Sequence, residues 1–123
     1  MNINFTFKNV SENVKEDMET YALDKLDDLA RYFVGIPEQS VIVRVTLESM
    51  EKHTALKALI HIEVRHGKSE LFQAEEVKHT YTEALDAVKD ILAHQISTKF
   101  EKLKDMAKQA VPEAEMDEED VIS

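Results

Sequence analysis

The chain of 123 residues contains no cysteine, two glycines and two prolines. Without cysteine it can form no disulfide bond, no thiolate zinc site and no thiol nucleophile. Its two glycines, Gly35 and Gly67, are too few for a glycine-rich phosphate-binding loop. The sequence also lacks a secretion signal at its start and any apolar run near the ~20 residues that a membrane span needs. We therefore expect a cytoplasmic protein with no membrane contact and a single hydrophobic core.

Positive charge is scarce as well. The 15 basic side chains stand against 25 acidic ones, which gives a net charge of −10, and a field of that sign repels phosphate at long range. Six of the acids follow Pro112, in a segment with too little apolar content to fold. We expect one domain over residues 1–108 and an acidic, disordered tail over residues 109–123.

Signatures of catalysis are missing from the sequence. The carboxylates are numerous, but no pair stands out as a general acid and base. The histidines show neither tight ligand spacing nor a helical i, i+4 pair, and they are His53, His61, His66, His79 and His94. We therefore expect no enzyme activity, no metal, no cofactor and no small-molecule substrate. A small hydrolase or metal enzyme would rest only on these scattered residues.

Apolar residues alternate with polar ones in three segments, which is the period of a half-buried strand. The segments are residues 2–8 around Phe5, residues 41–48 around Val43, and residues 56–64 around Ile60. Gly67 lies in a short polar turn, which predicts a hairpin into a fourth strand that contains Phe72 and Ala74.

Two helical stripes complete the pattern. The first begins after Val10-Ser11, where Ser11 or Asn13 is expected to cap the helix, and ends at Gly35 and Pro37; its members are Val14, Met18, Ala22, Leu26, Leu29 and Phe33. The second runs from about Thr80 to Lys108, with Tyr81, Leu85, Val88, Leu92 and Ile96 on one side. The sequence predicts an α+β fold of order β-α-β-β-β-α, with a four-stranded mixed sheet and both helices on one face. The last turns of the second helix should project beyond the sheet.

Two stretches carry a resemblance to a known family. They are Lys25-Leu26-x-x-Leu29-x-x-Tyr32-Phe33 and the run from Ala84 to Ile96, which includes Asp86, Asp90 and Gln95. They resemble the ribosome hibernation-promoting factor and ribosome-associated translation inhibitor family, in a short form like the sigma-54 modulation proteins. The resemblance covers roughly residues 3–104 and implies a shape like that of double-stranded-RNA-binding domains.

The resemblance implies a protein that inhibits translation by occupying the decoding channel of the small ribosomal subunit and stabilising inactive ribosomes. Binding would rely on shape and on cations that meet rRNA phosphates. By position, Lys25 matches the family's first-helix lysine, and Asp86, Asp90 and Gln95-Ile96 match its last-helix pattern. The sequence departs from the family where basic residues usually line the last helix, and there it has Ile91, His94, Ser97 and Thr98, with Thr82 in place of a tyrosine.

Seven side chains are the candidates for contact with rRNA phosphates: Lys25, Arg31, Lys89, His94, Lys99, Lys102 and Lys104. The last three lie on the projecting end of the second helix. Ordinary ion pairs on a solvated helix are the alternative explanation for them. The net charge of −10 keeps a second interpretation open, an acidic protein-interaction module on the same fold that does not bind rRNA. In either case we expect a monomer or a weak dimer.

Overall fold

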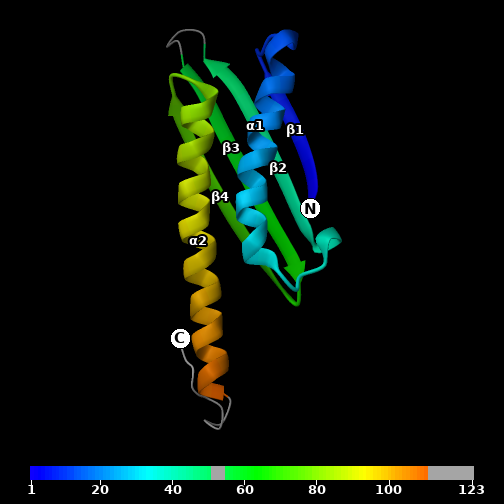
Figure 1. Ribbon diagram of the computed structural model, residues 1–123, viewed down its shortest axis with the longest axis vertical. Helices are drawn as coiled ribbons and strands as arrows, with labels where there is room; N and C mark the ends of the chain where they lie inside the picture. Colours follow the sequence, from blue (N-terminus) through cyan, green and yellow to red (C-terminus); the bar gives the residue numbers. More distant parts are fainter. Residues whose placement is uncertain (51–54, 111–123) are drawn as a thin grey trace.

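The computed structural model describes residues 1–50 and 55–110, with side chains up to Lys99 (Figure 1). The elements, in order, are β1 (Asn2–Lys8), α1 (Glu12–Ala30), the 3-10 turns η1 (Arg31–Phe33) and η2 (Glu38–Ser40), β2 (Val41–Met50), β3 (Ala55–His66), β4 (Lys68–Lys78) and α2 (Tyr81–Ala110). The predicted β-α-β-β-β-α order is confirmed. From residue 111 onwards, the predicted acidic tail lies outside the described residues.

The strands form one mixed sheet in the order β1-β2-β3-β4. β1 pairs in parallel with β2, and helix α1 makes the crossover between them. β2, β3 and β4 follow as an antiparallel meander, in which Val45 lies opposite Ile60 and Ile62 lies opposite Phe72. Because the turn between β3 and β4 is tight, Gly67 adopts a φ of +74°, a conformation that side chains other than glycine rarely reach.

Both helices lie on the same face of the sheet, as the alternating strands predicted (Figure 1). The sheet residues that face them are buried, and Val43, Val45, Ile60 and Ile62 are fully removed from solvent. Leucines, isoleucines and valines of this kind each stabilise the fold by about 1.5–3 kcal/mol when fully buried. The apolar stripes predicted for the two helices supply the other side of the core. All residues of these stripes are buried except Val14 and Tyr81, which are half-buried.

The two long helices begin differently. The hydroxyl of Thr80 accepts a hydrogen bond from the backbone N–H of Glu83 at 3.2 Å and caps α2. Ser11 occupies the same position before α1, but its side chain makes no capping hydrogen bond. There the carbonyl oxygen of Ser11 accepts the N–H of Val14 at 3.2 Å. The expected side-chain cap by Ser11 is therefore wrong, because the backbone carbonyl takes that role.

Helix α2 is longer than the sheet it covers. Its 30 residues span about 45 Å at 1.5 Å per residue, and its last turns extend past the ends of the strands (Figure 1). The sequence predicts this overhang, because Lys99 and Lys102 fall on the same side of the helix as Leu85 and Leu92 and end the apolar stripe after Ile96. No helix in the described part of the chain combines the length and apolarity needed to cross a membrane.

Candidate nucleic-acid interface

The connection between β4 and α2 is short, so α2 runs back along β4 and its C-terminal end passes the β3–β4 turn (Figure 1). The end of α1 lies at this same end of the molecule. Arg31, Lys99 and the backbone positions of Lys102 and Lys104 are therefore gathered there. Lys25, Lys89 and His94 lie farther back along the two helices.

Lys25 belongs to a contact between the two helices. Its Nζ atom lies 3.1 Å from Oδ1 of Asp86 on α2 and 4.9 Å from the centre of the Tyr21 ring. The hydroxyl of Tyr21 donates a hydrogen bond of 2.7 Å to the same carboxylate oxygen. Only 20% of the Lys25 side chain is exposed. This lysine therefore joins α1 to α2 in the isolated protein.

The protonation of this cluster follows from its contacts. The hydrogen bond from Tyr21, followed by the hydrogen bond and charge of Lys25, holds the pKa of Asp86 below its ordinary value against the opposing effect of burial. The hydrogen bond to Asp86 in turn raises the pKa of Lys25 and of Tyr21. At neutral pH the cluster is a lysine–aspartate ion pair with a neutral tyrosine hydroxyl as its second donor.

Gln95 has an equally local role. Its Nε2 atom donates a hydrogen bond of 3.1 Å to the backbone carbonyl of Gln73 on β4. Three of the positions that carry the family pattern, Lys25, Asp86 and Gln95, thus make contacts that hold the helices to each other and to the sheet. A match to the family pattern at these positions therefore indicates how the helices and the sheet pack at least as directly as it indicates a binding surface.

The candidate rRNA contacts on the outer surfaces of the helices make weaker interactions within the protein. Lys89 lies 3.5 Å from its neighbour Asp90, an exposed side chain. Nη2 of Arg31 lies 3.4 Å from the hydroxyl of Tyr32, and the guanidinium carbon lies 5.2 Å from the centre of that ring. The imidazole of His94 is exposed. Exposed ion pairs contribute only about 0–1 kcal/mol and exposed cation–π contacts about 0.5–1 kcal/mol, so these interactions leave Lys89 and Arg31 available to a phosphate.

Lys99 connects the overhanging part of α2 to the sheet. Its Nζ atom lies 3.3 Å from Oε1 of Glu70, near the start of β4, with 43% of the lysine side chain and 22% of the glutamate side chain exposed. Lys102 and Lys104 follow on the next turn of the helix, where the structure describes the backbone and not the side chains.

One cation that the sequence interpretation did not select lies beside this group. Lys68 begins β4, directly after the β3–β4 turn, and it is exposed with no carboxylate partner among residues 1–50 and 55–99. Two features place Lys68 next to the end of α2: the predicted hairpin between β3 and β4, and the course of α2, which runs antiparallel to β4. We call Lys68, Lys99, Lys102 and Lys104 the basic end.

The uncovered face of the sheet offers one further cation. Arg44 on β2 is exposed, and the strand register aligns it with Asn4, His61 and Gln73 across the sheet. The Nδ1 atom of His61 lies 3.0 Å from Oε1 of Gln73, so this histidine has an ordinary hydrogen-bond partner. Within the described side chains, no group of three or more histidines and carboxylates is placed to hold a metal ion.

Comparisons with known proteins agree with the fold. A family model described as sigma 54 modulation protein / S30EA ribosomal protein matches residues 3–104. The crystal structure of the N-terminal domain of Thermus thermophilus Protein Y is similar, with a TM-score of 0.62 and 26% identity over 78% of this chain and 96% of that chain. A ribosomal subunit interface protein from Coxiella burnetii shares the fold, with a TM-score of 0.56 and 15% identity over 80% of this chain and 97% of that chain. No curated protein sequence matches the chain.

Proposed function

Because the chain belongs to the sigma 54 modulation protein / S30EA ribosomal protein family, we propose that it is a ribosome-associated inhibitor of translation. In this proposal it binds the small subunit or the whole ribosome in the decoding channel, in the cytoplasm, and stabilises ribosomes in an inactive state. The observation that carries the proposal is the family match over residues 3–104, nearly the whole described domain.

The mechanism we propose is occupancy. A protein that fills a channel lined with RNA needs a rigid shape and cations at its leading surface, and it turns over no substrate. The buried core supplies rigidity, and the basic end presents Lys68, Lys99, Lys102 and Lys104 from two elements. Arg31, Lys89, His94 and Lys25 stay in the set of proposed rRNA contacts, with Lys25 the most enclosed of them.

The alternative of an acidic protein-interaction module without rRNA binding receives no comparable support. It was motivated by the net charge of −10, and six of those charges follow Pro112. The family match favours ribosome association.

Co-sedimentation with purified ribosomes tests the proposal. The protein should pellet with small subunits and with whole ribosomes, and the bound fraction should fall as salt rises, because cation–phosphate contacts release counterions. Separate pelleting with small and large subunits assigns the site to one of them. Protein that stays in the supernatant with every ribosomal particle, even at the lowest salt, contradicts ribosome binding.

A matched pair of variants locates the surface. Lys99→Gln, Lys102→Gln and Lys104→Gln together remove three charges from the overhanging end of α2. The control variant Lys15→Gln, Lys57→Gln and Lys78→Gln removes three charges from the opposite end of the molecule, where each lysine has a nearby carboxylate. We expect the first variant to lose most of its ribosome affinity and the second to keep it.

A further inference from the structure

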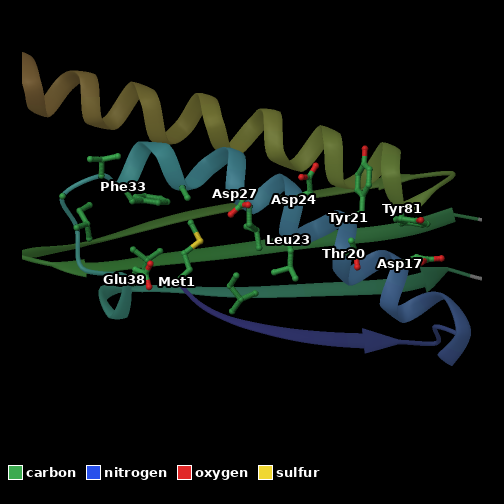
Figure 2. A pocket seen from close by; sticks show the side chains of 17 residues that line it. Met1, Asp17, Thr20, Tyr21, Leu23, Asp24, Asp27, Phe33, Glu38 and Tyr81 are labelled. Atoms are coloured by element: carbon green, nitrogen blue, oxygen red, sulfur yellow. The ribbon is translucent and has the colours of Figure 1, made fainter.

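A groove of about 930 Å³ lies between helix α1 and the part of the sheet formed by β1 and β2 (Figure 2). It exists because the two helices pack differently. Helix α2 packs directly on β3 and β4, whereas the main contacts of α1 are with α2, so α1 stands above the β1 side of the sheet. The space beneath it is open to solvent.

Much of the lining of the groove is apolar. Met1 and Ile3 come from the edge-strand side, Leu23 and Leu26 from α1, and Val34 from the segment after η1. Figure 2 shows Leu23 directed into the space between α1 and the strands. Leu23 is 40% exposed and Val34 is 85% exposed, so two of the large hydrophobic side chains that the described domain leaves in solvent belong to this one groove.

The charged side chains of the groove all have one sign. Asp17, Asp24, Asp27 and Glu38 line it, and no lysine or arginine does. None of the four forms an ion pair with another described residue. Seven carboxylates elsewhere in the described domain do, and they are Glu12, Glu48, Glu63, Glu70, Glu76, Asp86 and Asp90. Unpaired acids beside apolar surface attract a partner that is both basic and apolar.

Strand β1 adds a backbone component. It is an edge strand, paired on one side with β2, and among the described residues nothing pairs with its other side. Such an edge offers free N–H and C=O groups to an added strand. A peptide beside β1 would direct every second side chain to the helix-facing side, next to Ile3 and Met1 at the mouth of the groove.

We propose that this groove binds an extended, basic segment of a partner protein, which adds to β1 and directs both apolar and basic side chains, at every second position, to the helix-facing side, with the apolar ones beside Leu23 and Ile3. Lysines or arginines at the remaining helix-facing positions of the segment would pair with Asp24, Asp27 and Glu38. RNA does not fit, because its phosphates would meet four carboxylates, and the acids at residues 113–120 of the same chain are repelled for the same reason. This binding site goes beyond the proposed ribosome contact and does not require it.

A synthetic peptide tests the proposal directly. The probe is a fluorescein-labelled ten-residue peptide in which lysine and valine take turns at every second position, with threonine at the positions between, and binding to the full chain is followed by fluorescence anisotropy. A second peptide of the same pattern has glutamate in place of lysine. We expect saturable binding of the basic peptide, weakened by salt, and none of the acidic peptide. Failure of the basic peptide to bind at any salt concentration overturns the proposal.

Two variants of equal charge separate the groove from general attraction to an acidic protein. Asp24→Asn, Asp27→Asn and Glu38→Gln remove three charges from the groove. Glu16→Gln, Glu19→Gln and Glu75→Gln remove three exposed charges that do not line it. Affinity should fall about tenfold in the first variant and less than about twofold in the second, since exposed charges outside the groove act only through the screened field. An equal loss in both variants overturns the proposal.

Amide chemical shifts place the peptide on the protein. In a titration of the 15N-labelled protein, we expect the largest changes at Asn2–Lys8 and around Leu23 and Val34. Changes confined to the uncovered sheet face around Arg44 overturn the proposed location. A single-stranded RNA of ten nucleotides is the second probe, and RNA that displaces the peptide from the groove would assign this surface to nucleic acid instead.

Discussion

The two helices cover the same face of the sheet, yet they carry charge in opposite ways. Helix α1 has seven acidic residues and two lysines, and both lysines have a carboxylate partner, Glu12 for Lys15 and Asp86 for Lys25. Helix α2 has five acidic residues and five lysines, with three of the lysines after Lys99. The same sheet therefore supports an acidic helix at one side and an electrically balanced helix with a basic overhang at the other.

This difference reconciles the net charge of −10 with the proposed contact with RNA. The six acids after Pro112 and the seven of α1 account for the whole excess, because the remaining residues have 13 basic and 12 acidic side chains. At physiological salt the Debye length is about 8 Å, so a phosphate at the basic end responds mainly to the charges near it. Net charge alone is a poor guide to the partners of this chain.

The largest expected effect concerns packing. Leu92 of α2 is fully buried against the sheet, whereas Leu23 of α1 is 40% exposed. Leu92→Ala should lower the free energy of unfolding by about 3 kcal/mol, because it leaves a cavity in the core, and Leu23→Ala should cost less than about 1 kcal/mol. Urea unfolding followed by circular dichroism measures both. Similar losses in the two variants would show that α1 is packed as closely as α2.

The next largest effect tests the difference in charge between the two helices. Lys99→Gln, Lys102→Gln and Lys104→Gln together should lower ribosome affinity by about tenfold or more. They should also reduce the slope of log affinity against log salt by about two to three, since each phosphate contact contributes roughly 0.7–0.9. Pelleting across a salt series gives both quantities. An unchanged slope would mean that the overhang of α2 does not touch phosphate.

Much of the fold was predictable because periodicity is a local property. The alternation around Val43 and Ile60 and the stripe from Leu85 to Ile96 each placed an element, and the burial of these residues confirms the faces. The overhang of α2 was also predictable, because Lys99 interrupts the apolar stripe. The missing side-chain cap at Ser11 was not, since serine in that position is compatible with either a side-chain or a backbone contact.

The site was less predictable because it depends on contacts between distant segments. The sequence places Lys25 beside the buried stripe of α1 as a candidate phosphate contact, and only the approach of α2 shows that Asp86 and Tyr21 engage it. The sequence does not single out Lys68, because its neighbour in space, the end of α2, is far away in sequence. The groove was not predicted at all, since it results from the height of α1 above the sheet, which no local pattern encodes.

The contact between the helices should have a measurable pH dependence. The pKa of Asp86 is lower in the folded protein than in the unfolded chain, so its contribution is complete above about pH 4, the ordinary range of an aspartate, and is lost as pH falls through the folded pKa. Because half of this side chain is exposed, Asp86→Asn should cost only about 1 kcal/mol at pH 7. The difference from the parent protein should shrink in urea unfolding near pH 3. A difference that stays constant with pH would mean that the carboxylate charge does not hold α1 to α2.

The smallest effect is expected when acids of α1, rather than lysines of α2, are removed. Glu16→Gln, Glu19→Gln and Asp28→Asn remove three exposed acids from α1. If the basic end alone meets phosphate, ribosome affinity should rise by less than about threefold at 0.15 M salt, because these charges act only through the screened field. At 0.01 M salt the Debye length grows to about 30 Å, and the same variant should gain more. Pelleting at the two salt concentrations measures this. A tenfold gain already at 0.15 M would place α1 against the RNA, and the division between an acidic and a basic side of the molecule would then not describe how it binds.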